Sequence, residues 1–137
     1  MPIFSFSGKR PTNLGVVQGQ LPSCPESPNC VSSQADVNDQ EHFVTPFKTQ
    51  LSSSDAIAKL KIIIEGMERS KINEASDDYL YAEFASKIMG FVDDIEFYVD
   101  PASGMIQVRS AARLGRSDLG VNRKRVETIR EKFQAGS

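Results

Sequence analysis

The pattern of hydrophobic and polar positions divides the chain near residue 40. Residues 1–40 are rich in Pro, Gly, Ser, Asn and Asp, and their apolar positions follow neither a helical nor a strand period. From about residue 41 onward, periodic segments follow one another with short connections. At 137 residues the chain has the size of one domain. We therefore expect an irregular N-terminal arm over residues 1–40 and a single domain over residues 41–137.

Two segments of the domain have a helical period. Ser52 and Asp55 have the spacing of a capping box, and Gly66 is a suitable end for the helix that follows. The buried stripe of this helix is expected to consist of Ile57, Leu60, Ile64 and Met67.

A second helix is predicted over residues 119–133, with Ser117 or Asp118 as its cap. Its buried stripe is expected to consist of Val126, Ile129 and Phe133. Its cationic side chains, apart from any that turn toward the acidic strand, are expected to stay in solvent; they are Arg123, Lys124, Arg130 and Lys132.

Between and before these helices, alternating segments predict strands. Tyr79–Ser86 and Phe91–Val99 alternate most clearly. Pro46 confines the first, short strand to an edge of the sheet or lies at the end of that strand. The predicted strands cover residues 42–47, 71–75, 79–86, 91–99 and 105–111. The expected fold class is α+β: an antiparallel sheet of about four strands with two helices packed on one face.

The hairpin between the last two strands fixes a cross-strand pair. Residues 101–104 fit a four-residue hairpin loop, and matching the apolar faces places Phe97 opposite Val108. The same register sets Glu96 opposite Arg109 on the outer face, which predicts an ion pair. Asp93 falls on the inward face and needs a polar partner there.

Charge is unevenly distributed. Residues 101–137 carry a net charge of +5 and residues 1–100 a net charge of −7, which gives −2 overall and argues against general nucleic-acid binding. Tyr79, Tyr81 and Tyr98 share the outer sheet face, and we interpret them as a cover for a packed arm or helix rather than a platform for bases.

The amino terminus lacks a basic region followed by an apolar one, and the sequence has no apolar run long enough to span a membrane. A cytoplasmic location is expected, or a plastid if a targeting segment has been removed.

The arginine-rich stretch from Arg109 to Arg123 is the candidate ligand site. It enters a helix start through two glycines, where backbone N–H groups and the helix dipole favour an anion. The competing interpretation is a structural salt-bridge network with the neighbouring carboxylates. The stretch lacks the pattern of a nucleotide-binding loop. The candidate ligand-binding residues are Arg109, Ser110, Arg113, Arg116, Asp118, Asn122 and Arg123.

Asp93, Asp94 and Glu96 form the acidic counterpart. Asp94 and Glu96 share a strand face, as a two-carboxylate metal or acid–base site requires. Because Glu96 is assigned to Arg109, we expect a charge network here, with no metal, no cofactor and no catalytic residue.

Cys24 and Cys30 bracket a short polar segment. Two partly buried thiols, a short-loop disulfide and half of a metal site are the alternatives that the spacing leaves open. His42 is the chain's single histidine, which leaves a closed zinc site short of ligands within one subunit. At the start of an edge strand, His42 is interpreted as a surface residue.

Four blocks in order resemble the domain-of-unknown-function family 1499, and the similarity spans roughly residues 14–133. They are Cys24–Ser33, Tyr79–Phe84, Gly90–Phe97 and Val108–Val126. Residues 8–15 are similar to cyanobacterial and plastid members, which implies a photosynthetic source. Ala112 departs from the family pattern, which often has Ser there. The resemblance supports the domain boundaries and implies no activity.

These observations predict a non-enzymatic binding or assembly module. Its charged groove, with Asp93, Asp94 and Glu96 facing Arg109, Arg113 and Arg123, would receive an anionic small molecule or an acidic segment of a partner protein. The alternative is a thiol-redox-responsive protein that uses Cys24 and Cys30.

Overall fold

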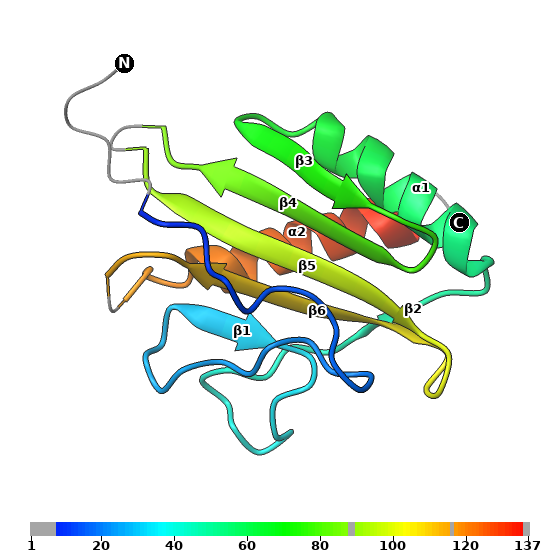
Figure 1. The fold of residues 1–137 in the computed structure, drawn as a ribbon, viewed down its shortest axis with the longest axis horizontal. Helices are drawn as coiled ribbons and strands as arrows, with labels where there is room; N and C mark the ends of the chain where they lie inside the picture. The colour runs from blue at the N-terminus through cyan, green and yellow to red at the C-terminus, as the bar shows by residue number, and fades with distance from the viewer. Residues whose placement is uncertain (1–7, 88–89, 116, 136–137) are drawn as a thin grey trace.

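The computed structural model describes residues 8–87, 90–115 and 117–135, which form an α+β fold (Figure 1). The fold class is as predicted, but the sheet has six strands instead of about four. In chain order the elements are β1 Cys30–Ser32, β2 Phe47–Lys48, α1 Ser53–Glu65, β3 Ser70–Ala75, β4 Tyr79–Ala85, β5 Val92–Asp100, β6 Met105–Ala112 and α2 Val121–Ala135.

The strands form one antiparallel sheet in the order β1-β6-β5-β4-β3, and β2 also pairs with β6. The predicted register of the β5–β6 hairpin is confirmed, with Glu96 opposite Arg109 and Phe97 opposite Val108. The strand expected over residues 42–47 is wrong, since the pairing there is limited to β2 and one isolated bridge at Phe43. Pro46, which has no N–H for a ladder, lies directly before β2.

Helix α1 is confirmed in its ends and its buried face. The Ser52 hydroxyl accepts the Asp55 backbone N–H, and the Gly66 N–H donates to the Ile62 carbonyl. Ile57, Leu60 and Ile64 are buried, whereas Met67, expected in the same stripe, follows the helix and is only partly buried. Neither helix among the described residues is long and apolar enough to cross a membrane.

Helix α2 begins two residues later than predicted and buries Val126, Ile129 and Phe133 as expected. The expectation that Arg123 and Arg130 stay in solvent is wrong, because both donate hydrogen bonds to backbone carbonyls of the segment before β2. A guanidinium carries five donors and can serve several carbonyls of a loop that lacks a ladder of its own.

The main core lies between the sheet and the two helices, which cover the same face (Figure 1). Phe47 and Phe97 pack edge to face there, with ring centroids 5.6 Å apart. The apolar side chains of β4, β5 and β6 that point to this face are mostly buried, as the predicted alternation requires, whereas Val99 at the end of β5 is partly buried.

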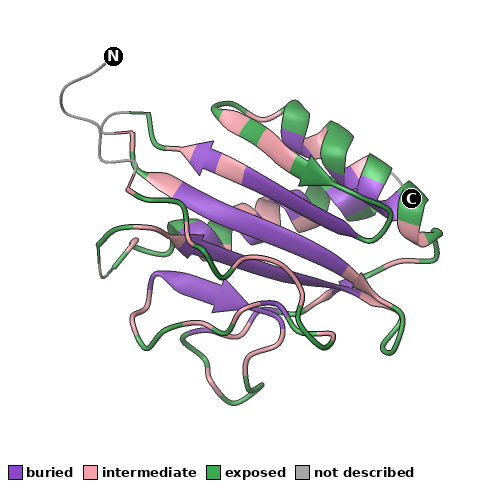
Figure 2. Ribbon diagram, in the orientation of Figure 1, coloured by how far each residue is buried: buried purple, intermediate pink, exposed green. Residues whose placement is uncertain are grey.

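The opposite face of the sheet is covered by the N-terminal segment, residues 8–23, which crosses β5 and β6 in front of the sheet (Figure 1). Leu21 packs with Tyr79, Tyr81 and Tyr98, so the tyrosines do cover a packed arm. β4, β5 and β6 are therefore largely buried along their length (Figure 2). The arm expected to be irregular over residues 1–40 also contains β1.

Candidate functional site

The predicted charged groove is divided between the two faces of the sheet. Successive residues of a strand point to opposite faces, so Asp93 faces the helices whereas Asp94 and Glu96 face the N-terminal segment. Asp93 pairs with Arg125 of α2, with 2.7 Å between Oδ2 and Nη1. Asp94 pairs with Arg113. Asp93 and Asp94 therefore belong to two separate networks, one on each face of the sheet.

Arg113 is the centre of the network under the N-terminal segment. Its Nε and Nη2 donate to the two oxygens of Asp94 at 2.9 and 2.8 Å, and Nη2 also donates to Glu83 at 2.6 Å. The hydrogen bonds to Asp94 raise the pKa of Arg113, although burial opposes this. The Tyr81 hydroxyl donates to Asp94, and burial raises the pKa of Tyr81. Two protein carboxylates therefore occupy the Arg113 guanidinium, which the sequence predicted to bind an anionic ligand.

Glu96 and Arg109 lie opposite one another but form only a loose pair. The distance from Arg109 Nη1 to Glu96 Oε1 is 3.8 Å. Glu96 Oε2 instead accepts the Tyr79 hydroxyl and the Gly15 N–H. Among the described residues, Glu96 Oε1 and Arg109 Nε have no hydrogen-bond partner. Burial raises the pKa of Glu96 and lowers the pKa of Arg109.

On the helix side, Asn122 joins α2 to β6. Its Oδ1 accepts the Ser110 hydroxyl, and its Nδ2 donates to Asp118 at 2.7 Å. Burial raises the pKa of Asp118, but hydrogen bonds from Asn122 and Gly120 outweigh burial, so the pKa falls below its ordinary value. Three predicted ligand residues therefore bind one another.

The remaining predicted arginines are placed as follows. Arg123 donates to the carbonyls of Gln40, Glu41 and Phe43. Arg116 lies outside the described residues. The partner of Asp93, Arg125, is a residue that sequence reasoning missed. The signal for it was the inward carboxylate of Asp93, which required a cation on a packed helix.

A cavity of about 340 Å³ lies where the arginine-rich stretch enters α2, and we call it the α2 pocket. One wall comes from the β4–β5 connection and the other from the connection between β6 and α2. Phe91, Leu114 and Val121 supply exposed apolar surface, and Arg69 and Lys87 supply cationic groups. The full lining is Arg69, Ala85, Ser86, Lys87, Phe91, Val92, Asp93, Ala112, Leu114, Gly115, Ser117, Asp118, Val121 and Arg125.

Asp118, which the sequence predicts as a ligand-binding residue, lines this pocket. Arg69 and Lys87 also line it, but the sequence analysis did not predict them. Arg69 follows α1, and Lys87 follows β4. Both reach the pocket only because β3 and β4 pair in the sheet. An isolated cation in a connection carries no sequence signal for such a contact.

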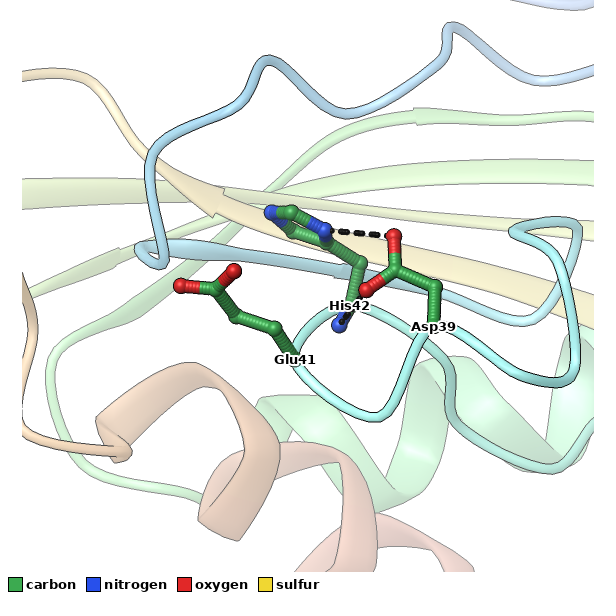
Figure 3. Close-up of side chains that lie close together, drawn as sticks. All are labelled: Asp39, Glu41 and His42. Carbon is green, nitrogen blue, oxygen red and sulfur yellow. Dashed lines mark hydrogen bonds and ion pairs between the residues drawn. The ribbon is translucent and has the colours of Figure 1, made fainter.

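Asp39, Glu41 and His42 lie close together, with possible metal-ligand atoms within 4.8 Å of one another (Figure 3). His42 Nδ1 lies 2.8 Å from Asp39 Oδ2, and Nε2 lies 3.0 Å from the Ser27 carbonyl oxygen. Both neighbours are acceptors, so both ring nitrogens carry hydrogen and neither has a free lone pair for a metal. The interpretation of His42 as a surface residue is wrong, because only 7% of it is exposed.

Cys24 and Cys30 form a disulfide, which decides among the three alternatives that the sequence left open. Cys30 is fully buried in β1. Cys24 is half-buried and lines a second cavity, of about 280 Å³, together with Asp39 and His42. The bonded residues 24–30 form a closed segment that we call the disulfide loop.

Comparison with known proteins gives one match. The family model described as "Protein of unknown function (DUF1499)" matches residues 20–133, which is most of the chain. No curated protein and no solved structure matches it. The match contains the disulfide loop, the sheet, the α2 pocket and nearly all of α2.

Proposed function

The chain belongs to the DUF1499 family, and we propose that it is a non-enzymatic binding module that receives an acidic segment of a partner protein in the α2 pocket. The observation that carries this proposal is the combination of apolar and cationic groups around one cavity of about 340 Å³. That volume lies within the range typical of ligand pockets, roughly 300–1,000 Å³.

Exposed apolar side chains concentrate at the α2 pocket. Phe91, Leu114 and Val121 in its lining are 39%, 42% and 45% exposed, and the adjacent Leu119 is 94% exposed. Single exposed apolar residues are ordinary, whereas a group of them around a cavity marks an interaction surface. This supports an apolar anchor in the ligand.

The charges around the α2 pocket favour an acidic ligand. Lys87 is exposed. Among the described residues, Arg69 forms its ion pair with Glu68 on the surface, and an exposed pair of this kind contributes little to stability. The carboxylates in the lining, Asp93 and Asp118, are already held by Arg125 and Asn122. The Asp118 carboxylate already caps the start of α2 by accepting the Gly120 and Asn122 N–H groups, so the attraction for an acidic ligand comes from Arg69 and Lys87.

The proposal moves the anion site away from the arginines that the sequence suggested. Protein carboxylates and carbonyls engage Arg113 and Arg123, so these two guanidinium groups are not available to an anionic ligand. The groups suited to acid–base chemistry, such as Asp94 and His42, are likewise held by partners. A binding role therefore fits the geometry better than catalysis.

The test is fluorescence anisotropy with a labelled hexapeptide that has a leucine–phenylalanine centre between two pairs of glutamates. We expect saturable binding that weakens at least fivefold in Lys87→Glu and Leu114→Ser. The matched controls are Lys61→Glu and Ile62→Ser, which change exposed residues of α1 outside the pocket lining. A peptide with lysines in place of the glutamates should not bind. Equal loss in pocket and control variants, or no binding of the acidic peptide, would contradict the proposal.

The disulfide favours a second candidate function, a protein that responds to thiol redox conditions. Equilibration in dithiol buffers, followed by alkylation and intact-mass measurement, tests it. Ready conversion of the native protein between oxidised and reduced forms supports this function. Reduction only after unfolding would make the disulfide purely structural.

A further inference from the structure

We propose that the Cys24–Cys30 disulfide is a thiol-exchange site that controls the α2 pocket through Asn29. The control rests on the proposed function of that pocket. The partner at the disulfide is a dithiol reductant, and the consequence of reduction is a loosened pocket wall.

Asn29 connects the disulfide loop to the α2 pocket. Its Nδ2 donates to the Gly115 carbonyl at 2.7 Å, and its own carbonyl accepts the Ala112 N–H at 3.0 Å. Ala112 and Gly115 both line the pocket. The Asn29 carbonyl also accepts Nδ2 of Asn122, at 3.4 Å. One residue of the loop therefore contacts two residues of the pocket wall, Ala112 and Gly115, and also Asn122 of α2.

The disulfide restricts the conformation of Asn29. Asn29 is 4% exposed and directly precedes Cys30, whose strand β1 pairs with β6. Within the loop, the Ser27 hydroxyl donates to Asn29 Oδ1, and the Ser27 carbonyl accepts from His42. Opening a short covalent loop restores conformational freedom to its residues. Reduction therefore weakens the contacts of Asn29 with Ala112 and Gly115 first.

The two sulfur atoms differ in access. Cys30 is fully buried, whereas Cys24 is half-buried and lines the cavity of about 280 Å³ beside His42. A thiolate of the reductant attacks Cys24 Sγ, so the Cys24–Cys30 bond breaks, a mixed disulfide forms and Cys30 leaves as a thiolate that takes a proton. The second thiol of the reductant then attacks its own sulfur in the mixed disulfide and releases Cys24. The protein gains two electrons and two protons, and the dithiol becomes a disulfide.

The expected effect is local. In the reduced protein the amide of Ala112 loses its acceptor more often, so hydrogen exchange in residues 111–115 becomes at least fivefold faster. Exchange in β4 and β5 stays nearly constant. The acidic hexapeptide binds the reduced protein at least fivefold more weakly than the oxidised protein.

The experiment compares the oxidised full chain, the chain reduced with dithiothreitol, the double variant Cys24→Ser/Cys30→Ser, and Asn29→Ala with its disulfide intact. Hydrogen exchange by mass spectrometry and peptide anisotropy are measured on each. Faster exchange in residues 111–115 of the reduced chain and both variants supports the inference. Because Asn29→Ala keeps the disulfide, its behaviour separates the Asn29 connection from a general effect of losing the bond.

Two results would overturn the inference: unchanged exchange in residues 111–115 after reduction, or equal acceleration throughout β4 and β5, which indicates global destabilisation. Failure of the oxidised chain to bind the peptide would overturn the pocket's proposed function instead. Faster local exchange in that case would still support control of the 111–115 segment by the disulfide.

Discussion

At the scale of single residues, the arginines predicted to bind a ligand act mainly as structural cations. Arg113 is the clearest example, because its side chain is 7% exposed and lies between Asp94 and Glu83. A buried carboxylate that loses its cation is costly, since neither solvent nor another partner replaces it. The contribution of Arg113 should therefore appear in the free energy of unfolding of the protein without any ligand.

Replacing Arg113 by Ala should lower the free energy of unfolding by about 3–5 kcal/mol, the usual cost of breaking a buried ion pair. Arg10→Ala is the matched control, because Arg10 binds the same Glu83 but is half exposed. We expect a much smaller loss for that variant, because an exposed ion pair contributes little to stability. Urea denaturation measures both. Similar small losses in the two variants would mean that Arg113 is free for another role.

His42 should remain protonated above its ordinary range. Burial lowers its pKa, but the hydrogen bonds to Asp39 and to the Ser27 carbonyl outweigh burial, so the pKa is raised. A raised pKa in the folded state means that this contribution to stability is complete below about pH 6.5, the ordinary histidine pKa. It is lost as the pH rises through the folded-state pKa.

An NMR titration of the imidazole ring tests this directly, because His42 is the chain's single histidine. The expected midpoint lies above about pH 6.5. Asp39→Asn should move the midpoint down, since it removes the carboxylate partner. A wild-type midpoint at or below the ordinary value would contradict the charged, doubly hydrogen-bonded ring.

At this scale, the sequence predicts the residue pairs that follow from strand alternation and register. It placed Glu96 opposite Arg109, and the structure agrees. It did not predict the loose 3.8 Å contact, because Glu96 is drawn to Tyr79 and to the Gly15 N–H. Gly15 lies 81 positions away in the sequence, and no periodicity reports such a contact.

At the scale of elements, local sequence patterns predicted correctly those helices and strands whose pattern lies within the element itself. Ser52 and Gly66 marked the ends of α1, and the alternation of β4, β5 and β6 identified their buried faces. The three residues of β1 were missed, because they form a strand only by pairing with β6 about 80 positions later. Short strands of this kind depend on the partner more than on their own sequence.

Helix α2 is positioned by Asn122 as well as by its apolar stripe. Asn122 is fully buried, and its replacement by Ala leaves the Ser110 hydroxyl without its partner. Leaving one buried polar group unsatisfied costs about 1–3 kcal/mol. We expect a loss of that size in the free energy of unfolding of Asn122→Ala, with helical content retained.

Lys124→Ala is the control for this prediction, because Lys124 is exposed on the same helix. Its effect should stay within about 0.5 kcal/mol. Chemical denaturation followed by circular dichroism measures both variants. If Asn122→Ala were as mild as the control, the hydrogen bonds of Asn122 would not position α2.

At the scale of the whole molecule, the sheet is buried on both faces by different means. The helices cover one face with apolar side chains, and the N-terminal segment covers the other over a layer of charges and tyrosines (Figure 1). The acidic and basic parts of the sequence meet mainly inside this arrangement. The α2 pocket is where apolar and cationic groups meet at the surface instead.

The sequence could indicate the region of this pocket but not its composition. The glycines before α2 indicate a candidate site in residues 113–123. Three residues of this stretch line the cavity, namely Leu114, Asp118 and Val121. Its opposite wall comes from residues 85–87 and 91–93, which meet α2 only in the folded sheet. The lining of a site that is assembled from separate connections can be identified only when the topology of the fold is known.

The most direct test of the binding proposal is a titration of the ¹⁵N-labelled oxidised chain with the acidic hexapeptide, followed by NMR. We expect saturable shift changes at pocket residues such as Ala85, Lys87, Leu114 and Val121. The exposed residues Lys61 and Ile62 of α1 should not change. Absence of saturable shifts at the pocket, or shifts confined to the surface of the N-terminal segment, would contradict the proposal.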